Sequence, residues 1–132
     1  MSTIDWSRAE APTLDDIEAI AHTAFAALPE RFQVLCGDVP FVVQDFPDDD
    51  VITEMELESE FEILGLFQGP DLALRDSGHP QPTMIFLYRR PILDYWAENQ
   101  ESLGTVIRHV LIHEIGHHFG LSDADMEKIE AH

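Results

Sequence analysis

The sequence contains a single cysteine, Cys36, among its 132 residues. A lone cysteine cannot form a disulfide within the chain, and it cannot supply a cysteine-based metal cluster, which needs several thiolates. The hydrophobic content of 45% is nevertheless typical of a globular protein with an apolar core. We therefore expect one domain spanning residues 1–132, with a loose N-terminal tail at residues 1–12.

Basic residues are also scarce. Only seven Lys and Arg stand against 26 Asp and Glu, which gives a formal net charge of −19. This balance argues against nucleic acid as a partner, because the neutralisation of phosphates requires clustered Lys and Arg. Such a negative field favours basic peptides as binding partners, unless it serves only solubility.

Long apolar runs are missing from the sequence. No segment approaches the roughly 20 apolar residues that a membrane-spanning helix needs. Residues Met1 to Pro12 are polar and acidic, and they contain no apolar core of signal-peptide length. We therefore expect no membrane association and a cytoplasmic, reduced location.

One helix, predicted over residues 103–119 with Ser102 as its N-cap, is apolar around most of its circumference. Such a helix is buried at the centre of a fold. It contains the pattern His113-Glu114-x-x-His117. Histidines four residues apart lie about one turn apart, so both imidazoles reach one metal ion, with the glutamate beside the first. We expect these side chains to emerge from the core-facing side of the helix.

Asp123 is the candidate for a third metal ligand. A catalytic zinc site takes three protein ligands and leaves one position to water. Gly120 permits a left-handed turn that ends the helix, after which the chain reverses towards the metal. Asp123 also has an ordinary structural role open to it. It begins a predicted last helix over residues 123–130, capped by Ser122, and an acidic residue there favours the helix dipole.

The unit His113-Glu114-x-x-His117-x-x-Gly120-x-x-Asp123 resembles the zincins, and more closely a family of short bacterial zincin-like metallopeptidases with a minimal zincin fold. The resemblance implies one Zn²⁺ ion held by His113, His117 and Asp123, with water in the fourth position. It also implies hydrolysis of peptide bonds with Glu114 as general base. The substrate is then a peptide or protein, and a basic one suits the acidic composition.

Three other functions are compatible with the same residues. The first is a non-catalytic zinc-binding domain that engages a regulatory partner, and the second is a zinc hydrolase acting on a non-peptide amide. The third is a structural zinc site, which would require a fourth protein ligand. Metzincins, a group of zincins, carry a methionine turn well after the third ligand. This sequence has no counterpart to it, because Met126 comes too early after Asp123.

Four neighbouring residues have less specific signals. His118 lies about 100° around the helix from His117, so packing is favoured over metal ligation. His109, one turn before His113, either contacts a substrate or another polar group or faces solvent. Tyr88 and Tyr95 are candidates for an oxyanion donor, and otherwise they are aromatic anchors.

The remaining pattern predicts an α+β fold, a minimal zincin-like fold with helices packed on a small mixed sheet of about three or four strands. An acidic loop is expected between residues 45 and 62, although residues 55–63 alternate between apolar and polar in a way that also suits a strand or a helix. The other expected elements are a helix from Thr13 to Leu28, a further turn at residues 30–35, strands at 39–46, 63–67 and 83–88, a loop at 71–82 and a short helix from Pro91 to about Ala97. The strands at 63–67 and 83–88 are expected to pair antiparallel.

Overall fold

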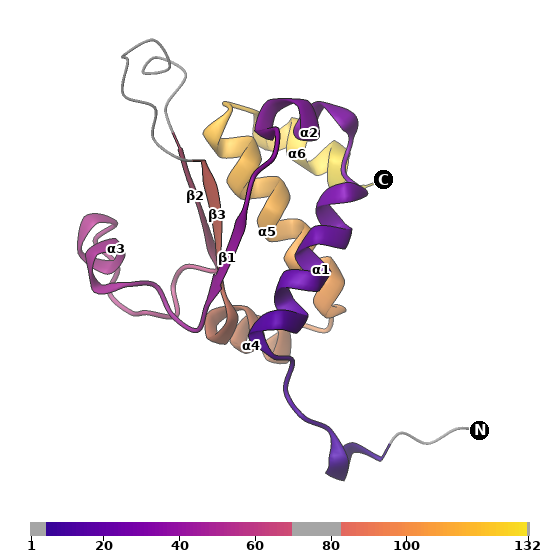
Figure 1. Ribbon diagram of the computed structural model, residues 1–132, viewed down its shortest axis with the longest axis vertical. Coiled ribbons are helices and arrows are strands. Elements are labelled where there is room, and N and C mark those ends of the chain that lie inside the picture. Colours follow the sequence, from indigo (N-terminus) through magenta and orange to yellow (C-terminus); the bar gives the residue numbers. More distant parts are fainter. Residues whose placement is uncertain (1–4, 70–82, 132) are drawn as a thin grey trace.

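The computed structural model describes residues 5–69 and 83–131, and it confirms the α+β class (Figure 1). Within the described residues, helices pack against a small mixed sheet, as predicted. The elements are α1 (Leu14–Ala26), α2 (Glu30–Cys36), β1 (Phe41–Gln44), α3 (Asp49–Glu54), β2 (Gly65–Gln68), β3 (Met84–Tyr88), α4 (Arg89–Glu98), α5 (Leu103–His118) and α6 (Asp123–Glu130), preceded by a short 3₁₀ turn at Trp6–Arg8.

The sheet has the strand order β1-β3-β2. Strand β1 runs parallel to β3, whereas β2 pairs antiparallel with β3, with Phe67 opposite Ile85. The predicted antiparallel pairing of these last two strands is therefore confirmed. The central strand β3 carries fully buried Ile85 and Leu87, which is why its sequence is nearly continuously apolar. Strand β2 lies at an edge of this sheet and faces the end of α5.

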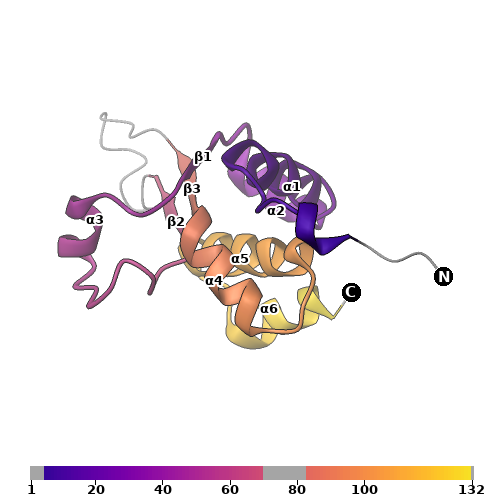
Figure 2. The ribbon, with the colours of Figure 1, turned by 90° about the horizontal axis from the view of Figure 1, so that it is seen from below.

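Helix α5 is the centre of the fold, as its sequence predicted. It packs against α1, β2, α4 and α6, and α1 and α6 lie on opposite sides of it (Figure 2). Its side chains on several faces are buried because each neighbouring element covers a different face. The buried residues are Val106, Ile107, Val110, Leu111, Ile112, Ile115 and Gly116.

The helix starts follow the capping residues in the sequence. The Thr13 hydroxyl accepts a hydrogen bond from the Asp16 N–H at 3.1 Å, and the Asp16 carboxylate accepts one from the Thr13 N–H at 2.9 Å. This is the predicted capping arrangement at α1. Ser102 and Ser122 are the N-caps of α5 and α6, and the hydroxyl of each accepts a hydrogen bond at 3.1 Å from a backbone N–H three residues later.

The prediction of an acidic loop over residues 45–62 is wrong in part, because α3 forms within it. Asp49 and Asp50 occupy the first turn of α3, where carboxylates stabilise the helix dipole. Residues 55–63 form turns rather than a strand or a helix. Helix α3 lies on the side of the sheet away from α5 (Figures 1 and 2), so it does not border the end of α5. The loop predicted at 71–82 lies outside the described residues.

Within the described part of the chain, no helix combines the length and the apolar character needed to cross a membrane.

Candidate active site

The predicted turn after α5 is confirmed. Gly120 adopts a positive φ of 77°, the left-handed conformation that glycine tolerates best. Its N–H donates to the carbonyl of His117 at 3.2 Å, and the N–H of Leu121 donates to the carbonyl of Gly116 at 2.8 Å. These two bonds form a Schellman motif. The motif reverses the chain, so that α6 packs back against α5.

This reversal places two carboxylates opposite a row of three histidines. His109, His113 and His117 lie one turn apart on α5, and we call them the histidine row. Their rings follow one another, with centroids 4.1 Å apart for the first pair and 5.6 Å for the second. Asp123 at the start of α6 and Glu130 at its end face this row.

The motif residues at the end of the row are exposed. Nε2 of His117 lies 3.7 Å from Oδ1 of Asp123, and their side chains are 59% and 87% exposed. The expectation that the ligands emerge from the core-facing side is therefore wrong for His117. In the last turn of α5, Ile115 and Gly116 are buried, whereas His117 lies on the side of the same turn that meets solvent. The structure does bring His117 and Asp123 together, as the motif requires.

His113 takes a different partner from the one expected. Its Nε2 lies 2.9 Å from Oε1 of Glu130, and Nδ1 of His109 lies 2.6 Å from the same oxygen. The ligand atoms of these three residues all lie within 4.8 Å of one another, which makes them the one group of this kind among the described residues. His113, His117 and Asp123 are not gathered into a single group in this way. Their joint ligation of zinc stays a prediction.

Glu114 lies on another side of α5, against the sheet. Its carboxylate accepts a hydrogen bond from the backbone N–H of Phe67 in β2. Burial raises the pKa of Glu114 above its usual range, while the Phe67 hydrogen bond and the nearby His117 act in the opposite direction. A half-buried carboxylate with a raised pKa next to a histidine is a suitable proton acceptor. Its pKa is closer to neutral pH than that of an exposed glutamate, so it is a stronger base.

The structure also shows where the other candidate residues, His118, Tyr88 and Tyr95, lie. The ring of His118 packs against Phe67, with centroids 4.1 Å apart, as expected for a packed rather than a ligating residue. Tyr88 is 1% exposed, so it serves as a buried aromatic anchor and has no access to a substrate. Tyr95 lines a pocket of about 330 Å³ together with His109 and Glu130, which leaves it open as a polar group near the histidine row.

The donor atoms of this region suit a zinc ion. Imidazole nitrogens and carboxylate oxygens are ordinary zinc ligands, and three of them leave a position for water. Among the described residues, Nε2 of His113 and Oε1 of Glu130 are buried and have no hydrogen-bond partner of acceptable geometry, despite their short contact. Buried polar atoms left in this state call for an ion or a water. The region therefore fits the metal that the motif predicts.

A comparison with protein families decides the relationship. A family model described as zincin-like metallopeptidase matches residues 36–132, which is most of the chain. The chain belongs to this family. The match covers the sheet, α5 and α6, and therefore includes every element that borders the histidine row. A comparison with curated proteins found no match.

Glu130 is the residue of this zincin-like site that the sequence pattern did not reveal. It lies seven residues after Asp123, which is about two helical turns, so both carboxylates fall on one side of α6. The spacing was readable, but its meaning depends on α6 packing antiparallel along α5. His109, left open between two roles, contacts Glu130 and thus has a polar partner.

Proposed function

We propose that this protein is a zinc-dependent peptidase that hydrolyses peptide bonds, with Glu114 as general base. The observation that carries the proposal is the position of the Glu114 carboxylate. It is held by a backbone N–H of β2, and it lies between His113 and His117 in the sequence of a zincin-like metallopeptidase. Membership of the family supports a peptidase, and the raised pKa supports the role of Glu114 in accepting a proton.

In this proposal His113, His117 and Asp123 hold the ion. His117 and Asp123 already approach each other, whereas His113 contacts Glu130 and would have to turn towards them to join the set. When bound there, zinc would supply a water of lowered pKa, about 7, and would polarise the carbonyl of the scissile peptide bond. The protein supplies the orientation, because the two histidines come from one rigid helix.

Glu114 moves the proton. Its free carboxylate oxygen takes a proton from the attacking water, and the same oxygen later delivers it to the leaving amine. The Phe67 N–H, which belongs to the backbone of β2, would orient the carboxylate for both steps. Burial supports this role because it raises the pKa and so strengthens the base relative to an exposed glutamate.

For the substrate we propose a peptide or protein with basic residues. The formal charge of −19 creates a negative field that attracts cationic segments and repels nucleic acid. The attraction between exposed charges weakens as salt screens it. Cleavage of basic peptides should therefore slow at high ionic strength, mainly through a higher KM.

The test is Glu114→Gln, which removes the base but keeps the size of the side chain. We expect full zinc binding and a loss of peptide hydrolysis of at least about 10²- to 10⁴-fold, the usual contribution of a general base. Glu127→Gln, an exposed position on α6, is the matched control and should cleave like wild type. The assay measures zinc by elemental analysis and cleavage with a peptide library.

Undiminished cleavage by the Glu114→Gln variant would contradict the assigned mechanism. Stoichiometric zinc in the wild type without cleavage of any peptide would favour the non-catalytic zinc-binding domain instead. Cleavage of other amides, with an intact peptide library, would point to the non-peptide hydrolase.

A further inference from the structure

Two members of the histidine row, His109 and His113, contact a carboxylate that is not part of the motif. One carboxylate oxygen, Oε1 of Glu130, lies between two imidazole nitrogens, at 2.6 Å from His109 and 2.9 Å from His113. Neither Oε1 of Glu130 nor Nε2 of His113 makes a hydrogen bond of acceptable geometry to any described residue. Two imidazole nitrogens and one carboxylate oxygen, each able to donate a lone pair to a metal ion, thus lie close together.

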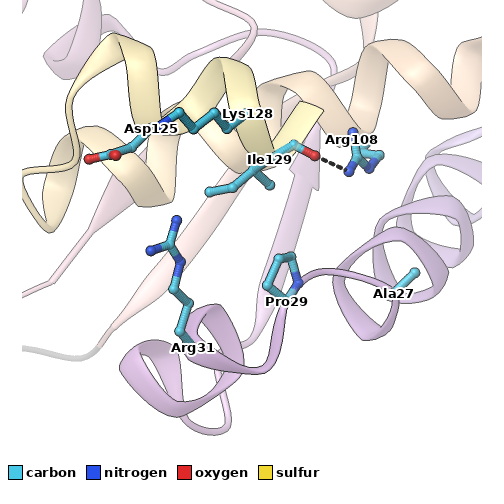
Figure 3. Close-up of a pocket in the computed structure, with 7 residues that line it drawn as sticks. All are labelled: Ala27, Pro29, Arg31, Arg108, Asp125, Lys128 and Ile129. Atoms are coloured by element: carbon cyan, nitrogen blue, oxygen red, sulfur yellow. Dashed lines mark hydrogen bonds between the residues drawn. The ribbon is translucent and has the colours of Figure 1, made fainter. Parts of the chain in front are cut away.

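The end of α6 that carries Glu130 is not frayed, because contacts with α5 hold it in place. Arg108 of α5 donates to the carbonyl of Ile129 at 2.8 Å and to that of Glu130 at 3.3 Å; Figure 3 shows the first bond beside a neighbouring pocket. A guanidinium at a helix C-terminus satisfies carbonyls that have no partner in the helix. The buried side chains of Met126 and Ile129 fix the same face of α6.

We propose that His109, His113 and Glu130 form a divalent metal site that is an alternative to the motif site and shares His113 with it. Two imidazoles and one carboxylate make a complete three-ligand set for zinc or cobalt, and a poor one for magnesium or calcium, which prefer several oxygens. The adjoining pocket of about 330 Å³, lined by Tyr95, His109 and Glu130 among others, gives room for water in the fourth position.

The sharing of His113 has a definite consequence for stoichiometry. The Nε2 atom of His113 coordinates one ion at a time, so the two ligand sets are mutually exclusive. The chain then binds one ion, held either by His113 with His117 and Asp123 or by His113 with His109 and Glu130. This inference concerns metal binding alone and does not depend on peptidase activity.

The experiment titrates cobalt(II) into metal-free full-length protein and follows the visible absorption of the bound ion. His117→Ala/Asp123→Ala removes the motif partners, and His109→Ala/Glu130→Ala removes the alternative partners. A fourfold variant removes all four. His22→Ala, far from α6 and with its ring against Phe41, is the control for loss of a histidine elsewhere. Circular dichroism of each metal-free variant confirms that it folds.

We expect one tightly bound ion in the wild type and in the His117→Ala/Asp123→Ala variant. The fourfold variant should bind at least about 100-fold more weakly, since loss of an outer partner alone costs 10- to 100-fold. Excess magnesium should displace nothing. His109→Ala/Glu130→Ala should also bind one ion, through His113 with His117 and Asp123. Loss of binding by this variant alone would overturn the claim that the two sets are alternatives.

Two other results would overturn the proposal. One is equally weak binding by the His117→Ala/Asp123→Ala variant and the fourfold variant, which would reduce the His109–His113–Glu130 group to polar contacts between helices. The other is two tightly bound ions per chain in the wild type, which would exclude the sharing of His113.

Discussion

Helix α5 has two polar sides that are built in different ways. On the side of the sheet, the Glu114 carboxylate is held by a main-chain N–H of β2, and the backbone of β2 approaches the helix closely. On the side of α6, each histidine of the row meets a side chain, Asp123 or Glu130, at the edge of the solvent. The proposed base thus contacts backbone, whereas the proposed metal ligands contact other side chains.

The difference teaches which part of the site has to move when a metal binds. A carboxylate anchored to a strand keeps its place as long as the sheet is intact. Side-chain pairs can exchange partners through rotamer changes, which do not require the backbone to move. His113 can therefore leave Glu130 for an ion without any change on the side of Glu114. Three substitutions test this division, the first on the α6 side and the others on the sheet side.

The largest effect is expected from Met126→Ala, which removes the side chain that packs α6 onto α5. Met126 is completely buried, and its Sδ lies 2.5 Å from where a Cβ on Gly116 would be. Truncating a buried methionine costs about 2–5 kcal/mol of unfolding free energy. Met55→Ala is the matched control because Met55 is 48% exposed. Urea denaturation of the metal-free protein measures both, and equal midpoints would show that α6 contributes little.

A smaller loss of stability is expected from Gly65→Ala on the sheet side. A Cβ at this position would lie 2.7 Å from Cγ1 of Val110 and 3.0 Å from the carbonyl oxygen of Phe86. The strand has to shift away from α5, at a cost of about 1–3 kcal/mol. The shift also moves the Phe67 N–H, so hydrolysis should fall while metal affinity stays the same.

Gly104→Ala is the control for this substitution, because no atom lies within 4 Å of a Cβ placed there. Alanine in a helix is favoured over glycine by about 0.5–1 kcal/mol, so this variant should be slightly more stable than wild type. Thermal unfolding compares the two variants. A Gly65→Ala protein as stable as the Gly104→Ala protein would show that β2 and α5 are not tightly packed.

The smallest effect, absent at neutral pH, concerns Tyr88 in β3. Burial, followed by the negative charges of Asp48 and Glu114, raises the pKa of Tyr88 to about 12. The unfolded chain ionises this tyrosine near pH 10, so the folded state loses stability as the pH rises from about 10 through about 12. Tyr88→Phe should remove this part of the alkaline loss. An unchanged slope of unfolding free energy against pH in that range would contradict it.

Much of the fold was predictable from local signals. Thr13, Ser102 and Ser122 mark helix starts that the structure reproduces, and Gly120 marks the turn after α5. These features were readable because capping and left-handed turns involve residues only a few positions apart. The helix α3 was missed because its acidic sequence also suits a loop, and its only partly buried residues are Val51 and Ile52.

The site divides in the same way. The spacing His113-Glu114-x-x-His117 with Asp123 was visible in the sequence, and the family match supports it. The exposure of His117 was not predicted, because the apolar residues around α5 show that the helix is buried but not which side of its last turn faces solvent. Glu130 was not predicted either, since its contact with His113 joins residues that are distant along the chain.

The sequence by itself determined the family, the buried helix and the types of donor atom, because each of these depends on residue identity and short spacing. Only the tertiary structure decided which carboxylate faces which histidine. That choice depends on the direction in which α6 returns along α5 after the Gly120 turn, and on the burial of Met126 that fixes its register. A motif along the sequence gives no information on how two helices pack against each other.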